Sequence, residues 1–366
     1  MAVADYNWFD RMVHRLAFGT AMPQDMLSDM EDSKFGTLIA AQPIDRPIFI
    51  TSLARAGTTL LLEILSRHSA LVTHSYRDMP FVLSPIMWRK LSGRFQVSQD
   101  RQERAHGDGM MVSADSAEAF EEVLWLKHFA GHYAQHGISV WSNDLPPAFV
   151  SALQRHMRAL IVSRTMAAAP GRRYLSKNNA NIARKDALVK AFPDALFIVP
   201  LRHPIDHAQS LLKQHERALK DHGESAFARA YTSDIGHFEF GPDHRPILFP
   251  GMEQAIAAYD PTTLDYWLAY WIAAYRQLDL DGQCVAIDME RFTEGDTTIG
   301  EIFEQLGLAG DDAASAFATA TIRPMPQRRE AAACDPLLHE QALTLYGNLR
   351  EKAKRSGAMA APEAVT

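Results

Sequence analysis

The sequence predicts an α/β fold in which helices flank a central parallel sheet. Short apolar runs alternate with helix-length segments, a pattern typical of parallel strands joined by crossover helices. The first such unit is the apolar run Ile48–Leu53, which is followed by the leucine-rich segment Thr58–Leu65. The run Ala195–Leu201 is followed in the same way by a helix that begins near Pro204. Because strands of a parallel sheet are buried on both faces, continuous apolar runs fit its interior.

Further strands and helices follow from the same patterns. Three more segments are predicted strands: Leu71–Thr73, Arg173–Ser176 and Cys284–Met289. Helices are predicted over residues 5–34, 116–136, 148–168, 262–278 and 299–306. Gly19 and Pro23 are expected to interrupt the first of these helices. Trp125, Phe129 and Tyr133 recur at helical spacing and are interpreted as a core stripe.

The chain is predicted to form one domain, because 366 residues can build a single large α/β unit. Its predicted parts are an N-terminal helical arm over residues 1–45, inserts with helices over 80–170 and 220–258, and a flexible tail over 354–366. Within the second insert, His237–Pro242 is interpreted as a loop or lid. Residues 91–115 are polar and irregular, and they are expected to be mobile.

Composition excludes several functional classes. The net charge of −7 argues against a general binder of nucleic acid or of anionic membranes. Two cysteines, Cys284 and Cys334, imply no disulfide framework and fit a reducing compartment. The first ten residues contain two aspartates and no apolar core, so no signal peptide is predicted. No apolar run approaches membrane-spanning length, and a cytoplasmic location without a transmembrane segment is expected.

The loop between the first strand and its helix has the composition of an anion site. A helix N-terminus carries N–H groups without intrahelical partners and a partial positive charge. Gly57 allows close backbone approach, Thr58 and Thr59 add hydroxyl donors, and Arg55 adds a permanent positive charge. This P-loop-like segment therefore predicts a cradle for phosphate or sulfate. The alternative is an ordinary strand-to-helix turn that happens to contain an arginine.

The loop is not a Walker A motif, whose pattern is G-x-x-x-x-G-K-[ST]. Ser52 stands at the position of the first glycine, and Thr58 stands at the position of the lysine. A kinase or NTPase that uses this loop would need that lysine to reach the phosphates. The sequence therefore favours another kind of phosphate or sulfate chemistry.

The segment Ala54-Arg55-Ala56-Gly57-Thr58-Thr59 resembles the phosphosulfate-binding loop of sulfotransferases, which commonly reads P-[KR]-[ST]-G-T-T. Ala54 and Ala56 depart from that pattern, whereas the cation, the glycine and both threonines match. The resemblance implies that 3′-phosphoadenosine 5′-phosphosulfate (PAPS) is the sulfuryl donor. The donor-binding residues that it implies in this loop are Arg55, Ala56, Gly57, Thr58, Thr59 and Leu60.

Two further segments are similar to the bacterial and tyrosylprotein branches of that family. Arg202 at a predicted strand end and Ser210 eight residues later resemble the pair that holds the 3′-phosphate of PAPS. Lys177 resembles a lysine that contacts the sulfuryl group and can neutralise the leaving oxygen. Without the family pattern, these residues could instead be a loop arginine, a serine bonded within its own helix and a surface lysine.

The general base is expected in the polar loop after the first helix. Members of the family use a glutamate or a histidine there, and this loop offers His74 and Asp78 but no glutamate. His74 has a side chain whose ordinary pKa suits work near neutrality, and Asp78 could serve if burial raised its pKa. The two candidates rank nearly equal, and each also has a purely structural interpretation. More remote candidates are His128, His132 and His237.

The resemblance implies a PAPS-dependent sulfotransferase. Its reaction would be an in-line, metal-independent transfer to a hydroxyl or amine, with adenosine 3′,5′-bisphosphate as the other product. The acceptor would be a small molecule, a glycan or a lipid, the inserts over 80–170 and 220–258 would form the acceptor side, and no nucleic-acid partner is expected. An oligomer is compatible with the sequence. The alternatives are a nucleotide-dependent kinase or NTPase, and a nucleotide-binding protein without catalysis.

Overall fold

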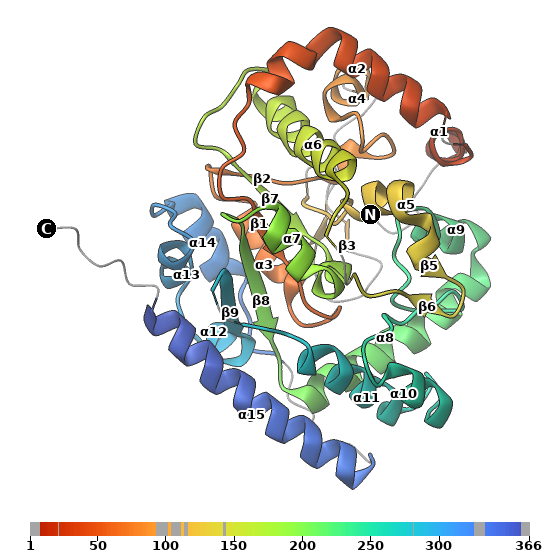
Figure 1. The fold of residues 1–366 in the computed structure, drawn as a ribbon, viewed down its shortest axis with the longest axis vertical. Coiled ribbons are helices and arrows are strands. Elements are labelled where there is room, and N and C mark those ends of the chain that lie inside the picture. Colours follow the sequence, from red (N-terminus) through yellow and green to blue (C-terminus); the bar gives the residue numbers. More distant parts are fainter. Residues whose placement is uncertain are drawn as a thin grey trace, which may run out of the picture.

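A five-stranded parallel sheet forms the centre of the protein (Figure 1). The computed structural model describes residues 8–20, 22–92, 102–103, 111–112, 116–141, 144–280, 282–325 and 334–359. The strand order across the sheet is β2-β7-β1-β8-β9. The strands are β1 (Ile48–Ile50), β2 (Leu71–Val72), β7 (Arg173–Lys177), β8 (Leu196–Leu201) and β9 (Cys284–Asp288). Each lies at a predicted strand, so the predicted fold class is confirmed.

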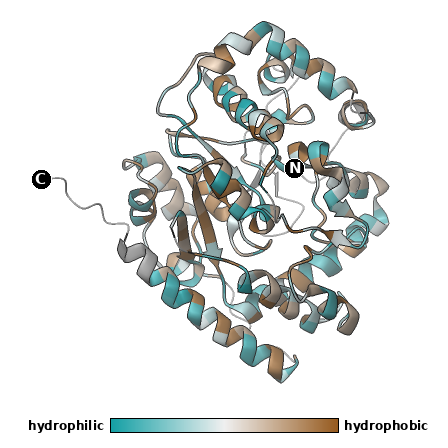
Figure 2. Ribbon diagram, in the orientation of Figure 1, coloured by the Kyte–Doolittle hydropathy of each residue, from teal (hydrophilic) through white to brown (hydrophobic). Residues whose placement is uncertain are grey.

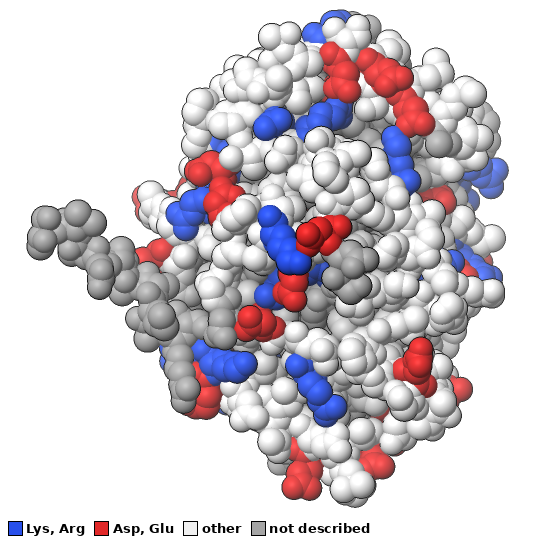
Figure 3. Space-filling model, in the orientation of Figure 1, with Lys and Arg blue, Asp and Glu red and all other residues white. Residues whose placement is uncertain are grey.

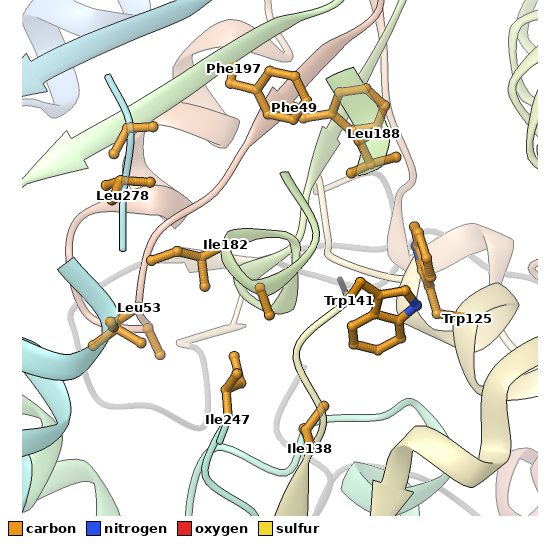
Figure 4. Close-up of a cluster of buried hydrophobic side chains, with 14 of the residues drawn as sticks. Phe49, Leu53, Trp125, Ile138, Trp141, Ile182, Leu188, Phe197, Ile247 and Leu278 are labelled. Atoms are coloured by element: carbon orange, nitrogen blue, oxygen red, sulfur yellow. The ribbon is translucent and has the colours of Figure 1, made fainter. Parts of the chain in front are cut away.

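The strands bury both of their faces, as continuous apolar runs require. Phe49 of β1 faces one side, where its ring stacks on Phe197 of β8 at 5.3 Å between centroids (Figure 4). Ile48 and Ile50 face the other side. This alternation follows from the two-residue period of a strand. Figure 2 shows the central strands as a hydrophobic band within helices of mixed hydropathy.

Helices cover the two faces of the sheet. The face of Ile48 and Ile50 packs against α3 (Thr58–Leu65), α12 (Met289–Glu294), α13 (Ile299–Gln305) and α14 (Asp312–Thr321). The face of Phe49 packs against α6 (Pro147–Thr165), α7 (Lys185–Ala191), α8 (Pro204–Glu224) and α11 (Leu264–Arg276). The sheet is therefore the middle of three layers.

The N-terminal arm is helical, as predicted, and it divides into α1 (Trp8–Phe18) and α2 (Met22–Ala41). Pro23 does not interrupt a helix, because it lies in the first turn of α2, where a missing N–H costs nothing. The arm is tied to the rest of the protein by polar contacts. His14 Nε2 lies 2.9 Å from Asp234 Oδ2 on α9 (Ala226–Asp234).

The helix predicted over residues 116–136 is much shorter in the structure. Only α5 (Glu122–Phe129) forms, followed by a 3-10 turn (Ala130–His132) and a small hairpin of β5 (Tyr133–Ala134) and β6 (Gly137–Ile138). Glycine is a poor helix former, and Gly131 lies within this stretch while Gly137 follows it directly. The aromatic stripe is nevertheless in the core, because Trp125 and Tyr133 are both buried.

The second insert is mostly helical. α8 runs on to Glu224, and α9 and α10 (Met252–Ala258) flank a single loop over residues 235–251. Phe238, Ile247 and Phe249 of this loop are buried, so the segment interpreted as a loop or lid is joined to the core. α4 (Pro85–Ser92) belongs to the first insert.

The two segments predicted to be mobile, 91–115 and 354–366, lie mainly outside the described residues. Within 91–115, the described parts beyond α4 are β3 (Gln102–Glu103) and β4 (Met111–Val112), which pair antiparallel. The flexible tail predicted over 354–366 stays a prediction. A long C-terminal helix, α15 (Pro336–Met359), continues through it, and residues 360–366 lie outside the described residues.

The surface agrees with the charge balance of the sequence. Figure 3 shows positive and negative side chains interspersed over the visible face, with broad uncharged areas between them. In the described part of the chain, no helix combines the length and the apolar character that crossing a membrane would require.

α15 supplies a testable feature of the fold, because it covers α11 and the edge strand β9. Leu349 on α15 is 3% exposed in the main core, whereas Leu343 on the same helix is 37% exposed. We expect Leu349→Ala to lower the free energy of unfolding by about 2–5 kcal/mol, because it removes buried methyl groups and leaves a cavity. Leu343→Ala is the matched control. Thermal unfolding followed by circular dichroism measures both, and equal melting temperatures for the two variants would contradict the assignment.

Candidate functional site

The carboxyl ends of three neighbouring strands bring the predicted site residues together. In the sheet, Ile50 of β1 is aligned with Lys177 of β7 and with Ile198 of β8. β1 continues into residues 51–57, which we call the cradle loop, and β8 ends just before Arg202. Ligands of open α/β sheets bind beyond the carboxyl ends of the strands. The sheet register therefore places the cradle loop, Lys177 and Arg202 at one edge.

The cradle loop turns sharply into α3. Arg55 has φ 69° and Gly57 has φ 107°, so both lie in the left-handed region that favours glycine. Gly57 is the residue before the first turn of α3, whose leading N–H groups have no intrahelical acceptor. Thr58 begins the helix and its side chain is buried. The local geometry is that of a helix N-terminus open to an anion.

The structure gives a further reason for glycine at position 57. A Cβ atom on this residue would lie 2.6 Å from Cε of Met289 on α12. The sequence-based reason was close approach of an anion to the backbone. In the structure, the required φ and the packing of Met289 also need a residue without a side chain.

α8 is bonded to the cradle loop through its first turns. Arg202 Nη1 donates to the carbonyl oxygen of Arg55 at 3.1 Å. Arg55 Nε lies 3.4 Å from Ser210 Oγ. The structure thus brings Arg55, Arg202 and Ser210 to one place, although they are up to 155 residues apart in the chain.

His207 is a residue of this region that sequence reasoning missed. Its Nε2 lies 2.7 Å from the carbonyl oxygen of Ala54, to which it donates. Burial, together with the positive charges of Arg202 and Arg55, lowers the pKa of His207 to about 3, so the ring is neutral. No local pattern in the sequence distinguishes this histidine. Its role is to hold the start of α8 against the cradle loop.

Lys177 ends β7 with only 7% of its surface exposed. The next residue, Asn178, donates from Nδ2 to Glu122 Oε2 at 2.7 Å. Glu122 is also paired with Arg184, whose guanidinium lies 3.7 Å from the ring centroid of Trp125. A buried network of charges and amides therefore lies under Lys177 and fixes the backbone that carries it.

Asn179 connects the start of α3 to the second insert. Thr58 Oγ1 donates to Asn179 Oδ1 at 3.3 Å. Asn179 Nδ2 donates to Glu239 Oε1 at 2.9 Å. Neither Asn179 nor Glu239 was singled out in the sequence, because Asn179 looks like an ordinary turn residue and Glu239 lies in an irregular loop.

A pocket opens between the cradle loop and the two inserts. It holds about 600 Å³ of space unfilled by protein atoms, including its open mouth. Its walls are mainly apolar, and Leu53, Ile138 and Ile247 among them lie toward one end of the core cluster in Figure 4. Its polar lining includes Lys177, Asn179, His237, Glu239 and Arg245. Both inserts contribute to its walls.

Glu239 is ionised in this pocket. Burial alone favours the neutral carboxyl, but the nearby His237 and Lys177 outweigh burial and hold the pKa of Glu239 below its ordinary value. The bond from Asn179 acts in the same direction. The pocket therefore combines a cationic lysine and an anionic glutamate within largely apolar walls.

His74 and Asp78, the two predicted bases, lie together outside this pocket lining. Asp78 is 0% exposed, and its Oδ1 accepts from Arg164 Nη1 at 2.9 Å. His74 is 2% exposed and stacks on His156, with 2.8 Å between their Nε2 atoms. Burial opposes the charge of Asp78, but Arg164 outweighs it and holds the pKa of Asp78 well below its usual range. The assignment of His74 or Asp78 as the general base stays a prediction. In the structure, both side chains belong to a buried cluster with His156 and Arg164.

The remote base candidates are in different places. His237 lines the pocket, whereas His132 stacks on Trp141 with 4.3 Å between ring centroids. His128 packs edge-on against Phe149. Within the residues that the structure describes, no group of three or more His, Cys, Asp or Glu side chains is arranged to hold a metal ion.

Comparison with known proteins gives one family. The sulfotransferase family model matches residues 47–239, which is more than half of the chain. No curated protein matches the sequence. Among solved structures, the sulfotransferase STF9 of Mycobacterium avium is similar over 96% of this chain and 88% of its own, with 13% identity and a TM-score of 0.49. The sulfotransferase STF1 of Mycobacterium tuberculosis is similar over 91% of this chain and 81% of its own, with 17% identity and a TM-score of 0.42.

The structural role of Asp78 can be tested through pH. Because the pKa of Asp78 is lowered in the folded state, its ion pair stabilises the protein above the unfolded-state pKa of about 3.9 and is lost as pH falls through the folded value. We expect Asp78→Asn to lower the free energy of unfolding by about 3–5 kcal/mol at neutral pH, because Arg164 keeps a largely buried, unpaired charge.

The difference between wild type and Asp78→Asn should stay constant from neutral pH to about pH 4 and shrink below it. Urea unfolding at several pH values measures it. Asp186→Asn is the control, because the Asp186 side chain is 83% exposed. A destabilisation by Asp78→Asn that disappears already near pH 6 would contradict the assignment.

Proposed function

Because the chain belongs to the sulfotransferase family, we propose that it transfers a sulfuryl group from PAPS to a hydroxyl or amine of a small acceptor. The observation that carries this proposal is the meeting of Arg55, Arg202 and Ser210 at the start of α3, beside a pocket lined by Lys177. These are the residues that the family pattern assigns to the donor. Arg55, Lys177 and Arg202 lie at the ends of three different strands, and Ser210 lies on α8.

The proposed donor site is positively charged. It contains two arginines, because Arg202 Nη1 donates to the carbonyl oxygen of Arg55 and Arg55 Nε lies 3.4 Å from Ser210 Oγ. An anionic ligand relieves the repulsion between such neighbouring cations. The N–H groups of residues 57–60 and the hydroxyls of Thr58 and Thr59 would bind the 5′-phosphosulfate. Arg202 and Ser210 would bind the 3′-phosphate, because an arginine fork matches phosphate oxygens.

In the proposed reaction, the acceptor oxygen or nitrogen attacks the sulfur in line with the bond to the leaving phosphate oxygen. That S–O bond breaks, and its electron pair stays on adenosine 3′,5′-bisphosphate. Lys177 and Arg55 would stabilise the charge that develops on the bridging oxygen, where a preorganised cation acts most strongly. Protein cations suffice for this charge, so we propose a metal-independent transfer. Cys284 and Cys334 are not joined in a disulfide, which fits our proposal that the protein acts in the cytoplasm.

The acceptor is proposed to bind in the pocket between the inserts. Phe238, Phe240, Trp267 and Tyr270 contribute aromatic walls. Such walls suit a small, largely apolar or ring-bearing molecule that presents one hydroxyl or amine, because apolar surface is buried favourably against them. Residues of both inserts line this pocket, which supports their proposed role as the acceptor side.

Lys177 gives the first test of this reaction. We expect Lys177→Met to slow sulfuryl release from labelled PAPS by about 10²–10³-fold, because the charge on the leaving oxygen loses its partner. Binding of adenosine 3′,5′-bisphosphate should be weakened far less. Lys190→Met is the control, since the side chain of Lys190 is 63% exposed. A variant at position 177 with the wild-type rate would remove Lys177 from the mechanism.

Arg202 gives a test of donor identity by isothermal calorimetry. We expect Arg202→Ala to weaken the binding of adenosine 3′,5′-bisphosphate by about 10–100-fold, because a hydrogen bond to a charged group contributes roughly 1.5–3 kcal/mol. Affinity for AMP, which lacks the 3′-phosphate, should fall much less, by no more than the loss of the Arg202 bond to the cradle loop costs. Arg217→Ala, a change at a more exposed arginine on α8, is the control. Tighter binding of ATP with magnesium than of adenosine 3′,5′-bisphosphate to the wild type would favour a kinase or NTPase instead.

A further inference from the structure

Glu239 occupies a position in the pocket that the motifs do not account for. It lies in the loop between α9 and α10, and it faces the same pocket as Lys177. The loop is held in place before this residue by His237, whose Nε2 donates to the carbonyl oxygen of Ala119 at 3.2 Å, and after it by two further bonds. Ile247 N donates to Tyr270 OH at 3.1 Å, and Arg245 Nη1 donates to the carbonyl oxygen of Tyr133 at 2.8 Å. The carboxylate is therefore presented by a fixed backbone.

The orientation of Asn179 follows from its two partners. An ionised carboxylate can only accept hydrogen bonds, so the Asn179 nitrogen must face Glu239. The Asn179 oxygen then faces the Thr58 hydroxyl, which donates to it. The bond from Asn179 uses one of the roughly four lone-pair sites of a carboxylate. Glu239 is thus oriented and still able to accept a proton.

Charged and titratable groups approach Glu239 from several elements. They are Lys177 at the end of β7, His237 and His244 in the same loop, and Tyr270 on α11. His237 and Lys177 hold the pKa of Glu239 below its ordinary value, so the carboxylate is charged throughout the neutral range. Burial lowers the pKa of His244 to about 4, so that ring is neutral. Burial raises the pKa of the Tyr270 hydroxyl, which stays protonated.

We propose that Glu239 is the general base of the transfer reaction and that Asn179 is the residue that positions it. This inference rests on the proposed function and assigns the residue that the loop of His74 and Asp78 was expected to supply. Glu239 meets the geometric requirement, because it lines the pocket that Lys177 also lines. His74 and Asp78 are instead bonded to His156 and Arg164 within the protein interior.

The proton and electron balance of the step is simple. The acceptor O–H or N–H bond breaks, and its proton moves to the Glu239 carboxylate. The electron pair of that bond forms the new bond to sulfur. The bond from sulfur to the bridging oxygen breaks, and its electrons stay on adenosine 3′,5′-bisphosphate beside Lys177. Glu239 returns its proton to water after the products leave.

The test uses PAPS labelled in its sulfuryl group, with water as the acceptor. The wild-type protein and Glu239→Gln are compared at saturating PAPS by the release of labelled sulfate. We expect Glu239→Gln to lower the rate by about 10²–10⁴-fold, the usual contribution of a general base. Calorimetric binding of adenosine 3′,5′-bisphosphate should be unchanged. Glu253→Gln is the control, because Glu253 is exposed on α10 and the charge change is the same.

The pH dependence separates a base from a structural residue. With Glu239 as the base, the wild-type rate is retained as pH falls through the histidine range near 6.5 and is lost only in the carboxyl range. Asn179→Asp places a second carboxylate beside Glu239, so the acid limb should move to higher pH. Added formate should restore part of the rate of Glu239→Ala and none of the rate of Lys177→Met.

Two results would overturn the proposal. One is a Glu239→Gln variant that binds adenosine 3′,5′-bisphosphate and keeps the wild-type rate and pH profile. The other is that His74→Gln or Asp78→Asn folds normally but loses the transfer rate, while Glu239→Gln keeps it. A wild type that fails to bind adenosine 3′,5′-bisphosphate would instead overturn the proposed function on which the assignment rests.

Discussion

The parallel alignment of β7, β1 and β8 is the constraint on which the site depends. Parallel strands end at a common edge, so the residues that follow them are brought together whatever their distance in the sequence. Lys177 is the last residue of β7, and the cradle loop and Arg202 follow β1 and β8. The hydrogen bonds of Arg202 and His207 to the cradle loop then fix its shape from the side of α8. A shift of one strand would separate these groups.

A second constraint is the free-energy cost of burying the charged side chains of Glu121 and Glu122 near the pocket. Glu121 and Glu122 are both buried, and removing such groups from water is expensive unless they are bonded. Tyr174 OH donates to Glu121 at 2.9 Å, and Asn181 Nδ2 donates to it at 3.0 Å. Glu122 is paired with Arg184. Because replacing one member would leave the others unsatisfied, the network holds the Asn178–Asn179 turn in one conformation.

Local patterns made most of the sheet and the donor residues predictable. Arg55, Lys177 and Arg202 each lie at or just after the end of a short strand, and the strand-to-helix sequence around each is contiguous. The acceptor side was less predictable. Asp78 looks available in the sequence, yet the arginine that pairs with it lies 86 residues away on α6. Glu239 lies in a loop without periodicity, and its place depends on long-range bonds such as the one from Asn179, 60 residues away. Such contacts leave no local signal.

The bond between Thr58 and Asn179 ties the two sides of the site to each other. A threonine hydroxyl has one proton to donate. In the structure it goes to Asn179 Oδ1, and in the proposed complex a phosphate oxygen at the start of α3 competes for it. Donor binding would therefore release the Asn179 oxygen while its nitrogen still holds Glu239. The side-chain amide of Asn179 thus links the proposed donor site to the proposed base, and its bond to Glu239 does not depend on the bond that the donor would displace.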